Sequence, residues 1–131
     1  MIFLQEKETA QETFDFVIMK LREQGKPAMA DKVCVYGEPK GCRCAVGHLM
    51  GDQRYTGAGG SIKTLVEYNE VNQPKYYSLI SEMQRAHDFP AVENENNKKD
   101  WQTACAIEMI KVAERHNLSP QSAKDWLNSI R

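Results

Sequence analysis

The stretch CVYGEPKGCRCAVGHLM, residues 34–50, decides the fold class of this chain. It holds three of the four cysteines and one of the three histidines. A short β-branched and aromatic run leads into a turn that contains a proline and two glycines, and a second short apolar run follows. This order is typical of a β-hairpin. We therefore expect strands at residues 33–36 and 42–46. The closing AVGHLM also fits the start of a short helix, if the second strand ends near Cys44.

Outside this stretch the chain has the periodicity of α-helices. Thr9 and Glu12 have the spacing of a capping box, and Gly25 supplies a helix end. Four apolar residues between them recur on one helix face: Phe14, Val17, Ile18 and Leu21. Further helices are predicted at residues 61–69, 74–88, 100–117 and 118–131, with loops at 51–60 and 89–100.

The resulting fold class is α+β and mostly helical. We predict about five helices packed around a single β-hairpin in the N-terminal third of the chain. The length of 131 residues suits one hydrophobic core, so residues 1–131 are expected to form a single globular domain.

Composition and charge narrow the classes of function. Hydrophobic residues make up 41% and charged residues 27% of the chain, as in folded globular proteins. The net charge of -1 provides no global attraction to nucleic acid or to an anionic membrane. The N-terminal MIFLQEKETA has no basic region, and no apolar run approaches the length of a membrane span. We expect a cytoplasmic protein with reduced thiols, no membrane partner and no cofactor.

A zinc site is one hypothesis for the cysteine-rich stretch. Cys34, Cys42, Cys44 and His48 together supply four suitable ligands. Cys42 and Cys44 are separated by one residue, which on a strand places their side chains about 7 Å apart. Ligand sulfurs around one zinc ion lie nearer to about 4 Å from each other. A turn is therefore needed to bring these ligands together.

A nucleophilic thiol is the second hypothesis. Cys44 would be the nucleophile of a small hydrolase or transferase, with His48 or His87 as its base. On a helix that begins near Cys44, His48 would share its face. Asp88 adjoins His87, but adjacent helical residues point apart, which makes it a poor orienting group.

Packing is the interpretation that we favour. Free cysteine behaves as a small hydrophobic residue and is often buried. Cys34, Cys44 and Cys105 all have apolar neighbours in the sequence. His87 extends an apolar helical stripe, where a histidine commonly lies at the edge of the core with a hydrogen-bonded ring nitrogen.

The chain resembles a family of small proteins encoded by tailed bacteriophages and prophages. The shared pattern is a Cys–x–Tyr pair, a glycine turn, a CAxGxLxxDxxY run and, further on, an HD and a tryptophan. The matching residues are Cys34, Tyr36, Gly41, Cys44, Ala45, Gly47, Leu49, Asp52, Tyr55, His87, Asp88 and Trp101. The likeness covers residues 9–115, and Cys42 lies outside its pattern, which weakens the zinc hypothesis. It implies a phage or prophage gene product in the bacterial cytoplasm and brings no particular activity.

We therefore expect a non-enzymatic interaction protein that binds a host or phage macromolecule, such as an inhibitor of host machinery or defence. No complete catalytic set is visible in the sequence, and a protein is the expected partner. Candidate contact residues are Tyr36, Arg43, Arg54 and Tyr55, and the loops at 51–60 and 90–100 are where we expect a binding patch. A tyrosine beside two arginines also suits nucleic acid, although the near-zero net charge argues against this. The oligomeric state stays open.

Overall fold

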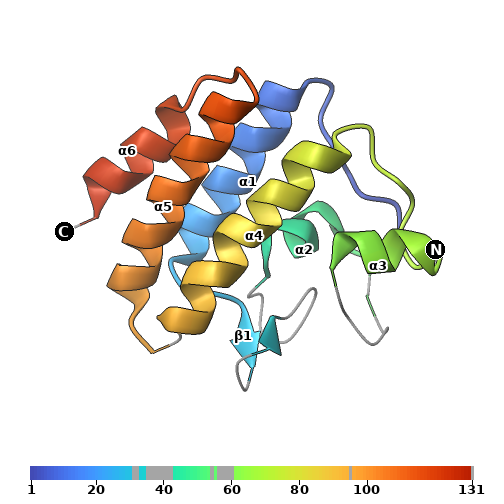
Figure 1. Ribbon diagram of the computed structural model, residues 1–131, viewed down its shortest axis with the longest axis horizontal. Helices are drawn as coiled ribbons and strands as arrows, with labels where there is room; N and C mark the ends of the chain where they lie inside the picture. The colour runs from blue at the N-terminus through green and yellow to red at the C-terminus, as the bar shows by residue number, and fades with distance from the viewer. Residues whose placement is uncertain (31–32, 35–42, 54, 56–60, 95, 131) are drawn as a thin grey trace.

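The computed structural model describes residues 1–30, 33–34, 43–53, 55, 61–94 and 96–130. In chain order the elements are α1 (Ala10–Gln24), β1 (Met29–Ala30), β2 (Val33–Cys34), α2 (Ala45–Leu49), α3 (Ile62–Glu67), α4 (Tyr77–Glu93), α5 (Lys98–Arg115) and α6 (Gln121–Ser129) (Figure 1). Four long helices, α1, α4, α5 and α6, make up the body of the molecule.

The predicted α+β fold is wrong, because the described part of the chain is a helical protein. Its β structure consists of the two-residue contact of β1 with β2, in which Met29 pairs with Cys34, and an isolated parallel bridge between Ile2 and Val71. In place of the predicted return strand at 42–46, the described residues lead into α2, which begins at Ala45 with Cys44 as its N-cap. The backbone N–H of Val46 donates to the side chain of Gln84 at 2.8 Å, so α4 and not a second strand supplies its acceptor. Residues 35–42, where the hairpin turn was predicted, lie outside the described residues.

Helix α1 follows its local signals closely. The hydroxyl of Thr9 accepts from the backbone N–H of Glu12 at 3.0 Å and donates to the Glu12 carboxylate at 2.9 Å. At the other end Gly25 adopts φ 70°, and its N–H donates to the carbonyl of Leu21. A left-handed residue at this position is a common helix end and favours glycine.

The loop predicted at 89–100 is largely helical. Helix α4 continues to Glu93 although Pro90 lies inside it, and α5 begins at Lys98. Proline removes one backbone donor from a helix. Here Pro90 is buried, and its carbonyl accepts both the backbone and the side-chain amide of Asn94, at 2.9 and 3.0 Å. Burial of Pro90 and Ala91 against the core extends the helix past its expected end.

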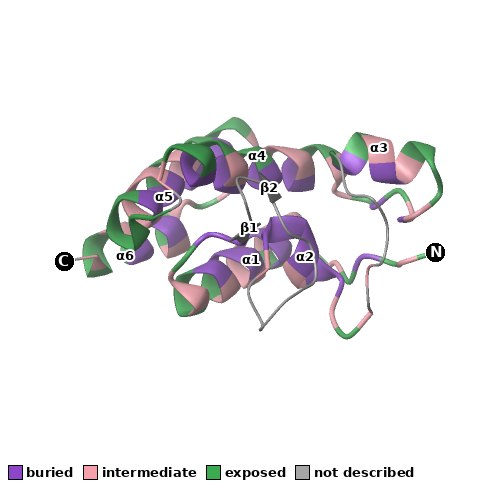
Figure 2. Cartoon of the chain, turned by 90° about the horizontal axis from the view of Figure 1, so that it is seen from below, coloured by how far each residue is buried: buried purple, intermediate pink, exposed green. Residues whose placement is uncertain are grey.

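The core lies between two groups of helices. Figure 2 shows α4 and α5 on one side and α1 and α2 on the other, with the buried residues facing inward. Helix α5 packs against both α4 and α6, and α2 packs against α1 and α4. The rings of Trp101 and Trp126 meet edge to face at 5.8 Å, which joins α5 to α6. No helix in the described ranges is both long and apolar enough to cross a bilayer.

Candidate functional site

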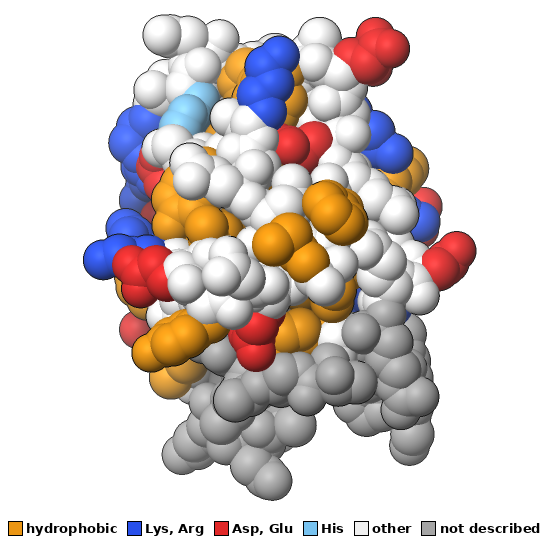
Figure 3. Space-filling view, turned by 90° about the vertical axis from the view of Figure 1, so that its right-hand side faces the viewer, with side chains coloured by type: hydrophobic (Ala, Val, Ile, Leu, Met, Phe, Trp, Pro, Cys, Tyr) orange, Lys and Arg blue, Asp and Glu red, His pale blue; other side chains and the backbone are white. Residues whose placement is uncertain are grey.

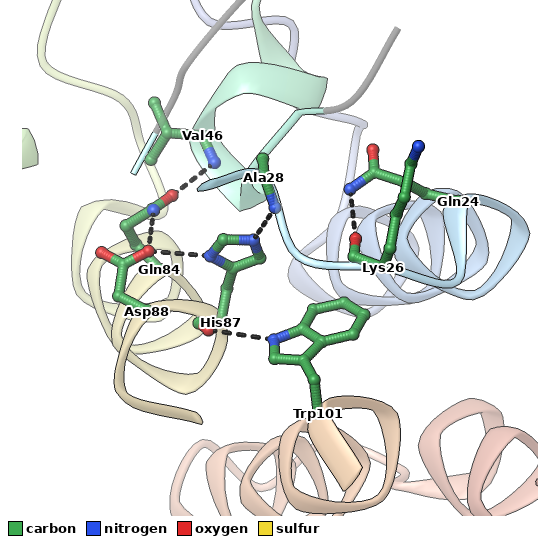
Figure 4. Close-up of polar contacts among 8 residues, drawn as sticks. All are labelled: Gln24, Lys26, Ala28, Val46, Gln84, His87, Asp88 and Trp101. Carbon is green, nitrogen blue, oxygen red and sulfur yellow. Dashed lines mark hydrogen bonds and ion pairs between the residues drawn. The ribbon is translucent and has the colours of Figure 1, made fainter. Parts of the chain in front are cut away.

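His87 is the centre of a buried polar network on the inner face of α4 (Figure 4). Its side chain is fully buried, and the backbone N–H of Ala28 donates to its Nε2 at 3.1 Å. Because Nε2 accepts this bond, the ring proton resides on Nδ1, which donates to Oδ1 of Asp88 at 2.8 Å. The ring is therefore a neutral imidazole with both nitrogens bonded inside the protein. The expectation of one satisfied nitrogen is confirmed, but Asp88 does orient the ring, contrary to our expectation.

Gln84 extends the network to a second helix. Its Nε2 donates to Oδ1 of Asp88 at 2.7 Å, and its Oε1 accepts from the N–H of Val46 at 2.8 Å. On the other side, Nε1 of Trp101 donates to the backbone carbonyl of His87 at 3.2 Å. One continuous chain of hydrogen bonds thus joins the segment after α1 with α4, α2 and α5 (Figure 4).

The Cys44 thiol lies in the same buried region. The residue is fully buried, and burial is the main cause that raises the pKa of its thiol to about 12. The negative charge of Asp88 raises this pKa as well. Cys105 is also fully buried, and burial followed by Asp88 raises the pKa of its thiol. Because the thiolate is the nucleophilic form, neither protonated thiol is prepared for attack on a substrate.

His87 and Asp88 are paired as a catalytic base is paired with the carboxylate that orients it. The other ring nitrogen of His87, however, is not free to take a proton from a substrate. A base must reach the proton that it removes, usually through the ring nitrogen opposite the carboxylate. In His87 that nitrogen is Nε2, which holds the Ala28 amide. The geometry of His87, Asp88 and Cys44 therefore supports a structural role.

His48 lies at a different place, beside a hollow of about 600 Å³ between α1 and the segment around α2. Its Nε2–H donates to Oε1 of Gln24 at 3.0 Å, and the same oxygen accepts the backbone N–H of Arg43 at 2.7 Å. Burial is the main cause that lowers the pKa of His48 to about 4, and the charges of Arg43 and Lys20 lower it further. The ring is therefore neutral at physiological pH.

This hollow is not an anion site in its present form. Lys20 and Arg43 line it, but so do the carboxylates of Glu23 and Asp52. The guanidinium of Arg43 donates to the backbone carbonyls of Gly47 and Gly51 and so provides a donor for carbonyl groups at the C-terminal end of α2. Arg43, which we predicted to contact a partner, is thus engaged inside the chain.

Several predicted site residues fall outside the described part of the chain. These are Tyr36, Arg54 and Cys42, and for Cys34 only the backbone is described. In the described ranges no three histidine, cysteine or acidic side chains gather in a way that could hold a metal ion. Tyr55 is half-buried, and its hydroxyl donates to Glu70 at 3.1 Å. The zinc hypothesis, which depends on Cys34 and Cys42, stays a prediction.

A half-open groove of about 800 Å³ runs along α4 and α5. Its walls are formed by Tyr77, Ser78, Ser81, Glu82, Arg85, Ala86, Phe89, Pro90, Glu93, Ala104, Glu108, Val112 and Arg115. Phe89 is 69% exposed at its edge, and Val92 on the same helix is 53% exposed. Large apolar side chains in contact with water at a concave surface often mark a binding face. Sequence reasoning missed this groove because it ended the helix at residue 88.

A second group of exposed apolar residues lies at the N-terminus and the end of α3. Met1, Phe3 and Tyr68 are 64%, 60% and 74% exposed. Figure 3 looks onto this side of the molecule and shows hydrophobic side chains in several separate groups, with charged and other side chains between them. None of these three residues lines either of the two hollows described above. The α4–α5 groove is therefore the stronger candidate for a binding site.

No protein-family model, no curated protein and no solved structure matches this chain. The resemblance to phage and prophage proteins accordingly stays a prediction, and function is inferred from the chain's own residues.

Proposed function

We propose that this protein acts by binding another protein chain and not by catalysis. The observation that carries the proposal is a contrast between two sets of residues in the described chain: those with side chains suited to chemistry, and those that line the α4–α5 groove. Of the side chains that sequence analysis singled out for chemistry, Cys44, His48 and His87 are described, and they are buried or hydrogen-bonded within the chain. The α4–α5 groove, by contrast, offers Phe89 to the solvent at its edge.

The shape of the groove favours a helix as its occupant. It runs between two long helices, and the α4 residues that line it recur at helical spacing, as Ser78, Glu82, Arg85 and Phe89 show. An amphipathic helix that lays its apolar face into such a groove is a common mode of protein recognition. A small molecule would instead be 70–90% enclosed by its pocket, in the usual range of such sites. An edge residue as exposed as Phe89 suits a longer, helical partner.

The proposed context is the one that the resemblance implies. The protein would act in the cytoplasm of a bacterium that carries the phage or prophage, on a host or phage protein. Inhibition of host machinery or of host defence is a role that needs only such binding.

A photo-crosslinking amino acid in place of Phe89 tests the proposal in living bacteria. The matched control places the same group at Phe3, which is 60% exposed but outside the groove. We expect a discrete protein crosslink from position 89 and none of that size from position 3. The purified partner should then bind Phe89→Ser about tenfold more weakly than wild type, since removal of an aromatic side chain from an interface commonly costs more than about 1 kcal/mol. Equal crosslinking from both positions, or none from position 89, contradicts the proposal.

A further inference from the structure

On the outer face of α4, two charged residues of opposite sign lie at equal distances on either side of Phe89. Arg85, Phe89 and Glu93 follow each other at intervals of four residues, and all three are exposed. Four residues of helix rise about 6 Å, so the two charges lie about 6 Å before and after the aromatic ring along the axis. The charges have opposite sign.

These two charges have no partner within the described chain. Neither Arg85 nor Glu93 takes part in an ion pair there, whereas other charges along the groove do. The carboxylate of Glu82 contacts Arg115 at 2.7 Å and His116 at 2.5 Å, and Glu108 pairs with Lys111 at 3.2 Å. Among the described charges along the groove, Arg85 and Glu93 are thus exposed and without an ion pair.

A second α4 with the opposite direction complements this pattern. If two copies of the helix cross at Phe89, position 85 of one copy lies opposite position 93 of the other, because both are four residues from the crossing point. Each Arg85 then faces a Glu93, twice in the same interface. Residue i contacts j while j contacts i, which is the requirement for a two-fold symmetric dimer.

The apolar side chains near the crossing point are exposed in a single copy. Phe89 is 69% exposed, and Val92, three residues after it, is 53% exposed. On the facing wall of the groove lies the small side chain of Ala104 of α5. Apolar side chains that are now in water would be covered on both copies, which favours association.

We propose that a second copy of this chain occupies the groove, with α4 of each copy antiparallel to α4 of the other. This inference rests on the proposed function in one respect, namely that the groove takes a helix of another protein chain. The inference adds that the chain in the groove is a second copy of this protein. A different protein in the groove is the main competing outcome, and the experiment below separates the two.

Sedimentation equilibrium of charge-reversal variants tests the interface. In Arg85→Glu and in Glu93→Arg, like charges face each other at two symmetric places, and we expect the dimer of each variant to dissociate about tenfold more readily than wild type. The double variant, Arg85→Glu with Glu93→Arg, restores both attractive pairs and should return to within about threefold of wild type. Lys124→Glu on α6 has the same change in net charge as Arg85→Glu and should leave the dimer unchanged.

The possible results separate this inference from the proposed function. The inference is overturned if the wild-type chain is monomeric at about 0.5 mM. It is also overturned if neither charge reversal changes the dissociation constant of the dimer. If position 89 then still crosslinks to a different protein, the proposed function stands without the dimer. A dimer with the expected charge pattern supports both, and the absence of a dimer and of any crosslink from position 89 overturns both.

Discussion

The two faces of helix α4 differ in what their polar groups do. On the inner face, His87 and Gln84 are buried, and each of their hydrogen-bonding atoms has a partner in the chain, with Asp88 at the edge of the same network. On the outer face, Arg85 and Glu93 are exposed and have no ion-pair partner among the described residues. The residue types most associated with catalysis therefore stabilise the fold, and ordinary surface residues form the candidate binding face. The type of a residue indicates less about function than whether its polar atoms are already satisfied.

The largest expected effect concerns the reactivity of the Cys44 thiol. Its raised pKa of about 12, against an ordinary value of 9.0, reduces the thiolate fraction at neutral pH about a thousandfold. We expect iodoacetamide to modify Cys44 at least about a hundredfold more slowly in the folded protein than in urea. Mass spectrometry of the modified peptide measures this rate for Cys44 separately from the other cysteines. Equal rates in both states would show that the inner face opens to reagents and would revive the nucleophile hypothesis.

The next effect concerns the stability that His87 provides. His87→Ala leaves a cavity next to Trp101, deprives the Ala28 amide of its acceptor and leaves Asp88 with Gln84 as its remaining donor. We expect the free energy of unfolding to fall by about 3 kcal/mol, from the cavity and the unsatisfied donor together.

Urea denaturation measures the His87→Ala effect, and His116→Ala is the matched control. His116 is more exposed and bonds to Glu82 at the surface, so its loss should lower the free energy of unfolding by less than about 1 kcal/mol. If the two variants lose the same stability, the buried network does not have the structural role that we assign to it.

Some parts of this structure follow from local sequence and others depend on distant contacts. The ends of α1 were predictable because Thr9 and Gly25 act on their own neighbours. The strand predicted at 42–46 was wrong because a short apolar run fits a strand or a helix equally well. A contact distant in sequence favours the helix here. The side chain of Gln84, 38 positions beyond Val46, accepts the backbone N–H of Val46.

In the candidate site, too, the features that sequence analysis missed depend on contacts between residues outside the local sequence pattern. The polar stretch FPAVENENNKKD, residues 89–100, was predicted to be a surface loop, which separated Phe89 and Glu93 from the helix that presents them. Burial of Pro90 in the core reversed that expectation, and burial depends on the tertiary fold. The role of Asp88 was missed for a related reason. Adjacent helical residues usually diverge, but Gln84 and His87 both donate to the same Asp88 oxygen and hold it in place.

The smallest effect is the pH dependence that His48 contributes. Because its pKa falls to about 4 on folding from 6.5, the unfolded chain binds more protons between these values. Stability is therefore lost as the pH falls from 6.5 towards 4, by about 1 kcal/mol after allowance for solvent screening of this partly exposed ring. Urea denaturation of His48→Gln, which keeps a neutral donor for Gln24, should show a shallower decline in this range. An identical decline in both proteins would contradict this assignment.

The molar mass of an equimolar mixture of Arg85→Glu and Glu93→Arg is the most direct test of the binding face. One variant has two acidic residues beside Phe89 and the other has two basic ones, so each repels its own kind and attracts the other. We predict that each variant alone has a mass near the 14.9 kDa of one chain, and that the mixture approaches twice this value. A mixture that stays at the mass of the separate variants would contradict the assignment of the outer face of α4 as the surface where two chains meet.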